Sequence, residues 1–328
     1  MKKDEIIDFC KSLGLDTLGF IKCRKFEELE DFFCERKEKG LENEFEEKDI
    51  EKRINPFIYM EEGKTIISIA FPYLHDVNYY DNGFSVYTRG TDYHRVLKFY
   101  LNQICEFIEN AGGKALSFVD SNFLPERHIA YLAGVGFVGK NNLIITKKYG
   151  SYVFLGEIIT DIEIETTERN YKEIQDFSEC GSCELCYKSC PSKAINPYKK
   201  NSNICVSYFT QKKDLDDKHI KLLKGRVFGC DSCQNCCPYN KNAEFSKIQE
   251  FYPFDFMNNN NTLELVNAST KEFKESFFRT SCGWRGKNVL KRNALIKISN
   301  DNGDISEVKT DSPYLKNYVD RLLNSNKI

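Results

Sequence analysis

The sequence predicts an α+β protein in three parts, and three observations lead to this prediction. Segments typical of strands alternate with segments typical of helices over residues 1–165, which indicates a mixed α/β domain. Nine of the 14 cysteines fall between Cys180 and Cys237, among short elements and many turn residues, so we expect residues 166–250 to have a partly inorganic core. Residues 251–328 are mostly helical, and we expect a short pair of the helical-repeat kind there.

The elements of the first and third parts follow from hydrophobic periodicity. In chain order, we expect a helix over 4–13, a strand over 16–23, a charged helical stretch over 24–53, a buried strand over 64–73, a helix from 92 to 112, a strand over 114–120, a helix over 125–134, a β-hairpin over 143–159, and helices over 288–299 and 312–325. The strand over 64–73 is a continuous apolar run. Asp92 is the expected N-cap of the next helix, which ends at Gly112. The hairpin is expected to turn at Gly150.

The overall composition indicates a globular protein of the cytoplasm. Hydrophobic residues make up 41% of the 328 residues, charged residues 29%, and the net charge is −2. The chain contains no apolar run of about 18 residues, and its first residues lack the apolar core of a signal peptide, so we expect no contact with a membrane. In a reducing compartment, many cysteines in a chain of this length indicate metal binding or catalysis rather than disulfides.

The cysteine spacing indicates iron–sulfur clusters. Cys180, Cys183, Cys186 and Cys190 are separated by two, two and three residues, and a proline follows the last. This is the spacing of bacterial ferredoxins, in which three thiolates bind one [4Fe–4S] cluster and the fourth binds a second cluster. A structural zinc site needs only paired cysteines and not the final cysteine–proline pair. We therefore expect a ferredoxin-like domain with two [4Fe–4S] clusters.

The ligands of the two clusters are only partly determined by this spacing. Cys237 also precedes a proline, so it takes a role equivalent to that of Cys190, each binding the cluster of the other set. Cluster one is then bound by Cys180, Cys183, Cys186 and Cys237. Cluster two takes Cys190 and three of the four remaining cysteines, which are Cys205, Cys230, Cys233 and Cys236. Two neighbouring clusters conduct single electrons, which implies an acceptor elsewhere in the molecule.

A glycine-rich segment, AGVGFVGKN at 133–141, superficially suggests a phosphate-binding loop. It follows a helix, which is the wrong order for a dinucleotide-binding fingerprint, and no serine or threonine follows Lys140 as in a P-loop. We therefore expect no nucleotide to bind there.

Several motifs together resemble the epoxyqueuosine reductase family. They are YTRGTDYH at 87–94, VD at 119–120, ER at 126–127, the GKN segment, GSYVFLGEI at 150–158, the cysteine run, CVSYFT at 205–210, GCDSCQNCCPYN at 229–240 and KRNALIKI at 291–298. Members of that family use cobalamin and two [4Fe–4S] clusters to complete queuosine in tRNA. The resemblance extends from about residue 50 to residue 300, in the same order.

The resemblance implies roles for residues at the acceptor end. Asp120, which closes the VD strand, corresponds to the proton donor, with Asp92 and His94 as its relay. The cobalamin contacts correspond to Arg53, Asp120, Ile144, Leu155, Ser207 and Gln234, with the arginine of the ER pair at Arg127. A carboxyl group desolvated against a corrin would have a raised pKa, which would keep its proton near neutral pH. The family pattern also assigns Cys205, Cys230 and Cys233 to cluster two, and leaves Cys236 without an iron.

The substrate implied by the resemblance is a base in a tRNA anticodon loop. Residues 271–297 contain eight basic and two acidic side chains, although the whole chain is slightly acidic. A local basic patch of this kind can bind an RNA backbone. The expected contacts are Arg279, Arg285, Lys287, Lys291 and Arg292, near the aromatic residues Phe278 and Trp284.

We therefore expect an oxidoreductase that acts on tRNA, works as a monomer and receives electrons from an external low-potential donor. Two other functions fit part of the pattern. One is a corrinoid and iron–sulfur reductase for a small molecule, and the other is an electron-transfer protein with two clusters and no corrin.

Overall fold

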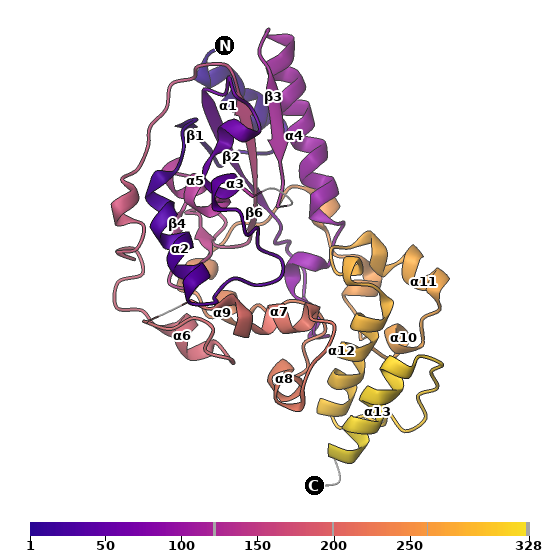
Figure 1. The fold of residues 1–328 in the computed structure, drawn as a ribbon. Coiled ribbons are helices and arrows are strands. Elements are labelled where there is room, and N and C mark those ends of the chain that lie inside the picture. The colour runs from indigo at the N-terminus through magenta and orange to yellow at the C-terminus, as the bar shows by residue number, and fades with distance from the viewer. Residues whose placement is uncertain (121–122, 199, 261, 326–328) are drawn as a thin grey trace.

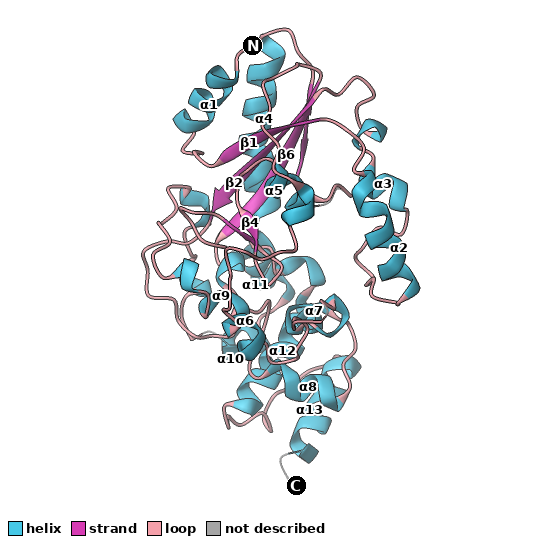
Figure 2. Ribbon diagram, turned by 90° about the vertical axis from the view of Figure 1, so that its left-hand side faces the viewer, coloured by secondary structure: helices cyan, strands magenta, loops and turns pink. Residues whose placement is uncertain are grey.

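A computed structural model describes residues 1–120, 123–198, 200–260 and 262–325 (Figure 1). A sheet with helices on both sides forms the N-terminal part. Short helices and loops form the middle of the chain, and longer helices form the C-terminal end (Figure 2). The predicted α+β class is confirmed.

The sheet of the N-terminal part has four strands, and every neighbouring pair is antiparallel. Its strands lie in the order β1 (Leu18–Lys22), β2 (Thr65–Pro72), β6 (Val153–Thr160) and β3 (Ala115–Phe118). Strand β2 is buried along its whole length, as its continuous apolar run predicts, because both faces of the sheet are covered. Phe118 pairs with Glu157, so the residues that follow β3 emerge beside the middle of β6.

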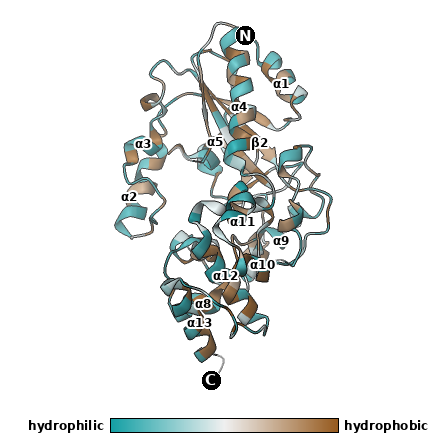
Figure 3. Cartoon of the chain, turned by 90° about the vertical axis from the view of Figure 1, so that its right-hand side faces the viewer, coloured by the Kyte–Doolittle hydropathy of each residue, from teal (hydrophilic) through white to brown (hydrophobic). Residues whose placement is uncertain are grey.

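The helices of this part pack on opposite faces of the sheet. Helix α4 (Tyr93–Asn110) and α1 (Lys3–Ser12) share a core with Ile67, Ile69 and Ile158. Helix α5 (Glu126–Leu132), α2 (Glu30–Glu38) and α3 (Ile50–Ile54) pack with residues of the other face, including Ile66 and Ile159. Figure 3 shows hydrophobic and hydrophilic positions alternating along α4, since one side of this helix packs on the sheet and the other faces outward.

Residues 24–53 are less helical than predicted. Helix α2 ends near Gly40, which adopts a φ of 60°, and residues 39–49 form a loop before α3 begins. This loop contacts the middle of the chain: the Asn43 side-chain amide donates to Ser202 Oγ at 3.0 Å, and the Asn203 amide donates to Gly40 O at 3.1 Å. The charged stretch thus joins the sheet to the cysteine-rich segment.

The predicted hairpin over 143–159 is wrong. The two-residue strand β5 (Ile144–Ile145) pairs with β4 (Phe137–Val138), whereas β6 joins the main sheet. Between them, Thr146 and Gly150 form an isolated bridge, and Thr146 Oγ1 accepts from Tyr149 N. The apolar side chains of β6 lie in the two main cores, and pairing with β5 could not bury both of its faces.

The middle of the chain has little apolar core of its own. Its helices are α6 (Leu185–Ser189), α7 (Val206–Gln211), α8 (Asp217–Leu223) and α9 (Ser232–Asn235). Around the first cysteine run, the buried hydrophobic cluster consists of Cys190, Ala194 and Ile195. The first cysteine run, unlike α7 and α8, has few buried apolar side chains, so it needs another source of stability, as expected for a segment that binds metal clusters.

The C-terminal helices are α10 (Thr262–Asn267), α11 (Thr270–Glu275), α12 (Lys287–Asn300) and α13 (Pro313–Ser325). Helix α12 was expected to be amphipathic, but it is buried on nearly all sides, including Arg292 and Asn293. Its core also contains Phe84 from the N-terminal part and Val206 from α7. Helices α12 and α13 run in the same direction, since Asn288 contacts Ser312 and Arg292 contacts Tyr314 (Figure 1). Within the described residues, no helix is long and apolar enough to cross a membrane.

Candidate functional site

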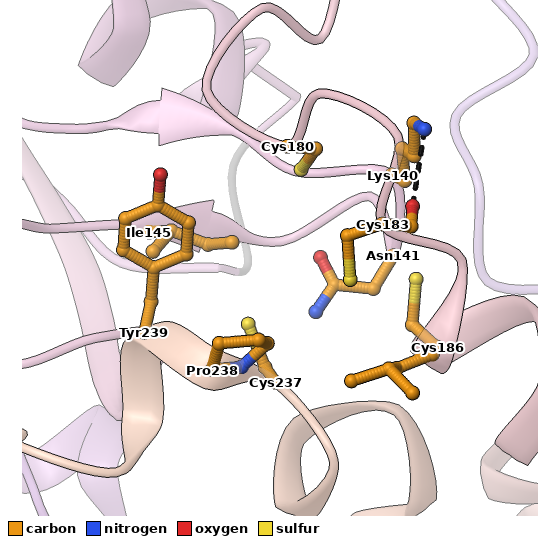
Figure 4. Close-up of a pocket in the computed structure, with 10 residues that line it drawn as sticks. Lys140, Asn141, Ile145, Cys180, Cys183, Cys186, Cys237, Pro238 and Tyr239 are labelled. Atoms are coloured by element: carbon orange, nitrogen blue, oxygen red, sulfur yellow. Dashed lines mark hydrogen bonds between the residues drawn. The ribbon is translucent and has the colours of Figure 1, made fainter.

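Four cysteines from two distant segments line one cavity (Figure 4). They are Cys180, Cys183 and Cys186 of the first run and Cys237 of the second, the four residues predicted for cluster one. Pro238 and Tyr239 close the cavity on one side, and the Tyr239 hydroxyl donates to Glu179 O at 2.7 Å. A pure thiolate set contributed by two loops fits a [4Fe–4S] cluster.

The remaining predicted ligands also lie close together. Cys190 belongs to a small buried cluster that Cys205 and Cys233 contact. Burial raises the pKa of the Cys205 thiol, and negative charge on Cys230 and Cys190 raises it further, so these thiols lie within electrostatic reach of one another. The structure therefore brings together the four cysteines expected at cluster two.

Cys236 is placed differently from its neighbour Cys237. Its thiol donates to Cys233 O at 3.7 Å, whereas Cys237 lines the cluster-one cavity. Cys236 nevertheless lies near enough to Cys186 that its charge raises the pKa of that thiol, after the larger effect of burial. The geometry favours Cys237 as the ligand, and replacing each of the two cysteines in turn tests this assignment.

The GKN segment, in which we expected no nucleotide site, holds the cluster loops in place. Lys140 Nζ donates to Gly181 O at 2.7 Å and to Cys183 O at 3.0 Å. Figure 4 shows the bond to Cys183 as a dashed line. The next residue, Asn141, donates from its side chain to Cys233 O at 3.4 Å. Adjacent residues of one loop thus contact segments that carry ligands of both clusters.

Replacing Lys140 with methionine is expected to lower the reduction potential of cluster one. A positive charge beside a cluster favours the reduced, more negative state, and losing it should cost on the order of 1 kcal/mol per electron at an effective dielectric constant of ~20. Redox titration followed by electron paramagnetic resonance measures the shift. Lys147→Met, which removes an exposed lysine from a nearby loop, is the matched control. Equal potentials in Lys140→Met and the wild type would contradict this role.

Asp120 lies at the centre of a hydrogen-bonded group beside the end of β3. Its Oδ2 accepts from the Tyr93 hydroxyl at 2.6 Å and lies 3.2 Å from His94 Nε2. His94 Nδ1 lies 2.8 Å from Asp92 Oδ1, which also caps α4 by accepting from His94 N. The predicted relay of Asp120, His94 and Asp92 is therefore assembled in the structure. Tyr93 was missed, although it stands between the two relay residues in the sequence.

The backbone of Asp120 is strained. Its φ of 43° lies in the left-handed region, which residues other than glycine seldom adopt. The Asp120 N–H donates to Glu126 Oε1 at 2.8 Å, which ties this conformation to the start of α5. The carboxyl side chain remains 58% exposed, so it can meet a molecule from outside. Strain at an exposed carboxylate is typical of a functional position.

The proton of this group resides on His94 rather than on Asp120. Hydrogen bonds to Asp120 and to Asp92 raise the pKa of His94 to about 9. Partial desolvation by the surrounding protein raises the pKa of the exposed Asp120 carboxyl, but the hydrogen bonds from His94 and Tyr93 outweigh it and leave this pKa below its ordinary value. The expected raised pKa of Asp120 is therefore not produced by these side chains. At neutral pH the pair is an imidazolium and a carboxylate.

A buried carboxyl lies in the strand next to this group. Glu157, on β6, is fully buried, and Ser68 Oγ donates to its Oε1 at 3.4 Å. Burial raises the pKa of Glu157 well above its ordinary value, and the negative charge of Glu126 raises it further. Burial in the strand therefore favours the neutral, protonated form of Glu157.

Glu157→Gln is expected to stabilise the protein at pH 8. An unfolded glutamate ionises above about pH 4.5, whereas the folded one keeps its proton to a higher pH, so the free energy of unfolding of the wild type falls as the pH rises through this window. The slope approaches ~1.4 kcal/mol per pH unit until the raised pKa is reached. Glutamine is neutral at every pH and removes this loss. Urea unfolding at pH 5 and pH 8 measures it, with the exposed Glu109→Gln as control; an unchanged pH dependence in Glu157→Gln would contradict the assignment.

Several residues expected to contact cobalamin are placed differently. Gln234 is 7% exposed, and its amide donates to Tyr73 Oη at 3.0 Å and Ser151 O at 2.9 Å, so it braces the β5–β6 loop from inside. Ile144 is buried in the core of the N-terminal part, because β5 packs inward against β4. Both side chains pack inside the protein, and their contacts with cobalamin stay a prediction.

The side chains of Arg53, Ser207 and Leu155 are partly exposed, so they remain able to contact cobalamin. The Arg53 guanidinium stacks on Phe33 at 3.7 Å and pairs with Glu46 at 3.5 Å, at the junction with the cysteine-rich segment. Ser207 is half-buried in the first turn of α7, two residues after Cys205. Leu155 is half-buried on β6, next to Phe154, which stacks on Tyr93 with ring centroids 4.4 Å apart. The Arg127 guanidinium donates to Asn142 O at 2.8 Å.

Two of the five predicted RNA contacts are not on an open surface. Arg292 is 0% exposed, and its guanidinium donates to Lys212 O and Lys213 O, both at 2.9 Å, because α12 is central in its core. This prediction is wrong: Arg292 is a structural residue. Lys291 is also buried along most of its length. Arg279, Arg285 and Lys287 are exposed or partly exposed.

The exposed basic segment adjoins the carboxylate group. Asp92 N donates to Arg279 O at 2.9 Å, so the segment before α12 touches the N-terminus of α4. Trp284 and Phe45 are exposed aromatic residues with ring centroids 5.5 Å apart, and the Arg285 guanidinium lies 4.7 Å from the Trp284 ring. The backbone of the basic segment thus meets the relay at Asp92, and its exposed aromatic and basic side chains gather around Trp284.

Two protein families match parts of this chain. Residues 53–121 match the family described as epoxyqueuosine reductase QueG, DUF1730, and residues 179–240 match the 4Fe-4S double cluster binding domain. The first segment contains Asp92 and His94 at the start of helix α4. The second contains all nine cysteines between Cys180 and Cys237.

Whole-chain relatives give the same result. The epoxyqueuosine reductase of Lactococcus garvieae is 36% identical over 311 residues, covering 92% of this chain and 87% of the relative. That of Bacillus subtilis is 35% identical over 309 residues, covering 90% and 78%. A crystal structure of epoxyqueuosine reductase with an epoxyqueuosine-modified tRNA stem loop is similar to the structure with a TM-score of 0.88 and 32% identity, over 98% of this chain and 89% of that one.

Proposed function

This chain belongs to the epoxyqueuosine reductase family, and we propose that it reduces epoxyqueuosine to queuosine in a tRNA anticodon loop with the help of cobalamin. The observation that carries the proposal is the group formed by Asp120, His94, Asp92 and Tyr93, an exposed proton-handling site in the same molecule as two sets of cluster ligands. The reaction consumes two electrons and two protons, and it releases the epoxide oxygen as water.

The cysteines would hold the two clusters and pass electrons singly. Cys180, Cys183, Cys186 and Cys237 bind cluster one, and Cys190, Cys205, Cys230 and Cys233 bind cluster two. Tyr87 is a neighbour that the relay shares with a ligand of cluster two. Burial is the largest cause of the raised pKa of Tyr87, and negative charges at Asp120 and Cys205 both add to it, so Tyr87 lies within electrostatic reach of both. An external low-potential donor supplies the electrons, and the chain works as a monomer.

Cobalamin, when bound, supplies a strongly reducing cobalt centre that can receive these electrons one at a time. The residues that fit it are half-buried ones near the relay. Val153, Phe154 and Leu155 leave a partly exposed apolar edge at the start of β6, and Ser207 stands after the cluster-two ligand Cys205. Arg53 and Arg127 lie farther along the junction between the N-terminal part and the cysteine-rich segment. An apolar edge beside an exposed carboxylate suits a large, flat and mostly apolar ring.

The relay residues hold and move the proton that opens the epoxide. His94, protonated at neutral pH, lies 3.2 Å from the Asp120 carboxylate and can protonate it when a bound substrate excludes water. Asp120 then gives this proton to the departing epoxide oxygen as a general acid. Asp92 holds the imidazole in place through Nδ1, and Tyr93 orients the carboxyl. Solvent supplies the second proton to the released oxygen.

The position of the basic segment supports tRNA as the substrate over a small molecule. The backbone contact between Asp92 and Arg279 joins the relay to a segment that carries exposed basic and aromatic residues. Such side chains can hold an RNA backbone and stack on unpaired bases.

A cobalamin titration tests the corrin part of the proposal. Anaerobic protein with both clusters assembled is mixed with cob(II)alamin, and the visible and electron paramagnetic resonance spectra are followed. We expect saturable binding at one cobalamin per chain. Protein that binds no cobalamin would instead favour the two-cluster electron-transfer function.

A further inference from the structure

A lysine-lined cavity lies between the N-termini of α12 and α13, away from the cysteines and the relay. Its volume is about 310 Å³, and its lining residues are Lys287, Asn288, Lys291, Lys309, Thr310, Asp311, Ser312 and Leu315. Three ammonium groups face one carboxylate there, so the lining carries a net positive charge.

Two helix N-termini point at this cavity. Because α12 and α13 run in the same direction, their positive dipole ends lie together, and Asn288 Nδ2 donates to Ser312 Oγ at 3.4 Å between them. Helix α12 is preceded by Gly286, which has no side chain to cap the first N–H groups. Helix α13 is capped in part, since Leu315 N donates to Ser312 Oγ at 3.5 Å.

Lys291 is the residue that indicates a ligand. It is 9% exposed, yet among the described residues no acceptor lies within hydrogen-bonding or ion-pairing distance of its ammonium group. The Glu272 carboxylate attracts it only from farther away, and burial together with the charge of Lys287 lowers the pKa of Lys291. Most of the Lys291 side chain is buried, and its ammonium group opens into the cavity without an acceptor of its own among these residues, so it is free to bind an anion that enters there.

The other two lysines complete an anion site. Lys287 Nζ donates to Thr270 Oγ1 at 2.7 Å, a neutral partner that leaves its charge uncompensated. Lys309 is exposed at the rim, where Thr310 and Ser312 add hydroxyl groups. Ammonium groups, hydroxyls and free helix N–H groups are the donors that bind phosphate in proteins.

We propose that this cavity binds a phosphate group, supplied by the backbone of the bound tRNA. The inference rests on the proposed function for the source of the phosphate, but the site itself is defined by its lysines and helix ends. In this proposal, Lys291 contacts the phosphate deep in a cavity and not on an open surface. Lys309 joins the predicted RNA contacts.

The test is the salt dependence of RNA binding. Fluorescence anisotropy with an unmodified anticodon stem-loop RNA gives the dissociation constant over a series of KCl concentrations. We expect Lys291→Met and Lys309→Gln each to weaken binding and to reduce the slope of log K against log salt by about 1. Lys309 is exposed, so its replacement cannot be mistaken for a folding defect. Lys297→Met is the matched control, because it removes a lysine of the same helix that pairs with Asp301 outside the cavity.

Unchanged slopes in both cavity variants would overturn the proposal. A thermal-shift titration with inorganic phosphate separates the two sources of the anion. Stabilisation by phosphate that is lost in Lys291→Met, together with unchanged RNA slopes, would mean a site for free phosphate and would overturn the assignment to RNA. Wild-type protein that shows the expected slope but converts no epoxyqueuosine would contradict the proposed reaction and leave the phosphate site intact.

Discussion

Asp120→Asn is expected to lower the rate of epoxyqueuosine reduction by about 10²–10⁴-fold, the usual contribution of a positioned general acid. Asparagine keeps the shape of the side chain and can still accept from the Tyr93 hydroxyl, but it cannot take a proton from His94 and pass it on. The measurement is single-turnover conversion of modified RNA, analysed by mass spectrometry of the nucleosides.

The control for this prediction separates proton transfer from assembly of the site. Asp120→Asn should keep its iron content, its cobalamin affinity and its RNA affinity, while Asp8→Asn, an exposed substitution on α1, should keep full activity. The pH profile supplies a further check. Removing Asp120 takes away the largest cause of the raised pKa of His94, so this pKa should fall from about 9 toward its ordinary value. Undiminished turnover in an intact Asp120→Asn protein would contradict the role of general acid.

Cys237→Ser is expected to lose cluster one. Cys237 is the second-run cysteine that lines this cavity, and a serine hydroxyl is a poor substitute for a thiolate ligand of iron. Iron analysis should fall from about eight to about four atoms per chain, since each [4Fe–4S] cluster needs its full set of ligands. Reduction of the substrate should fall with it, because electrons no longer have a complete route.

Cys236→Ser is the matched control, one residue away in the same segment. Its thiol donates to a backbone carbonyl, and serine can make the same bond, so this variant should keep both clusters. If Cys236→Ser loses iron and Cys237→Ser keeps it, the ligand assignment is reversed.

The sequence predicted most of the parts that follow local rules. The buried strand over 64–73 and the cap of α4 at Asp92 were confirmed, because an apolar run and a capping side chain determine structure within a few residues. The four cysteines that line the cluster-one cavity were predicted from the cysteine spacing alone. In this spacing, three thiolates separated by two residues each bind one corner of a cluster. The family followed from several motifs in the same order.

The remaining errors concern contacts between distant segments. Strand β6 left the predicted hairpin because its two faces are buried only in the main sheet. Arg292 was expected on a basic surface, but α7 and α13 surround its helix and accept its hydrogen bonds. The protonation of the relay could not be predicted either, since it depends on the distances that place His94 between two carboxylates.

The most direct test of the account is conversion of tRNA that carries epoxyqueuosine. Anaerobic protein with both clusters and cobalamin is supplied with a low-potential reductant, and the nucleosides are analysed by mass spectrometry. The account predicts that epoxyqueuosine disappears and queuosine appears in equal amount, and that no conversion occurs when cobalamin is omitted. Protein with full clusters and bound cobalamin that leaves epoxyqueuosine unchanged would contradict it.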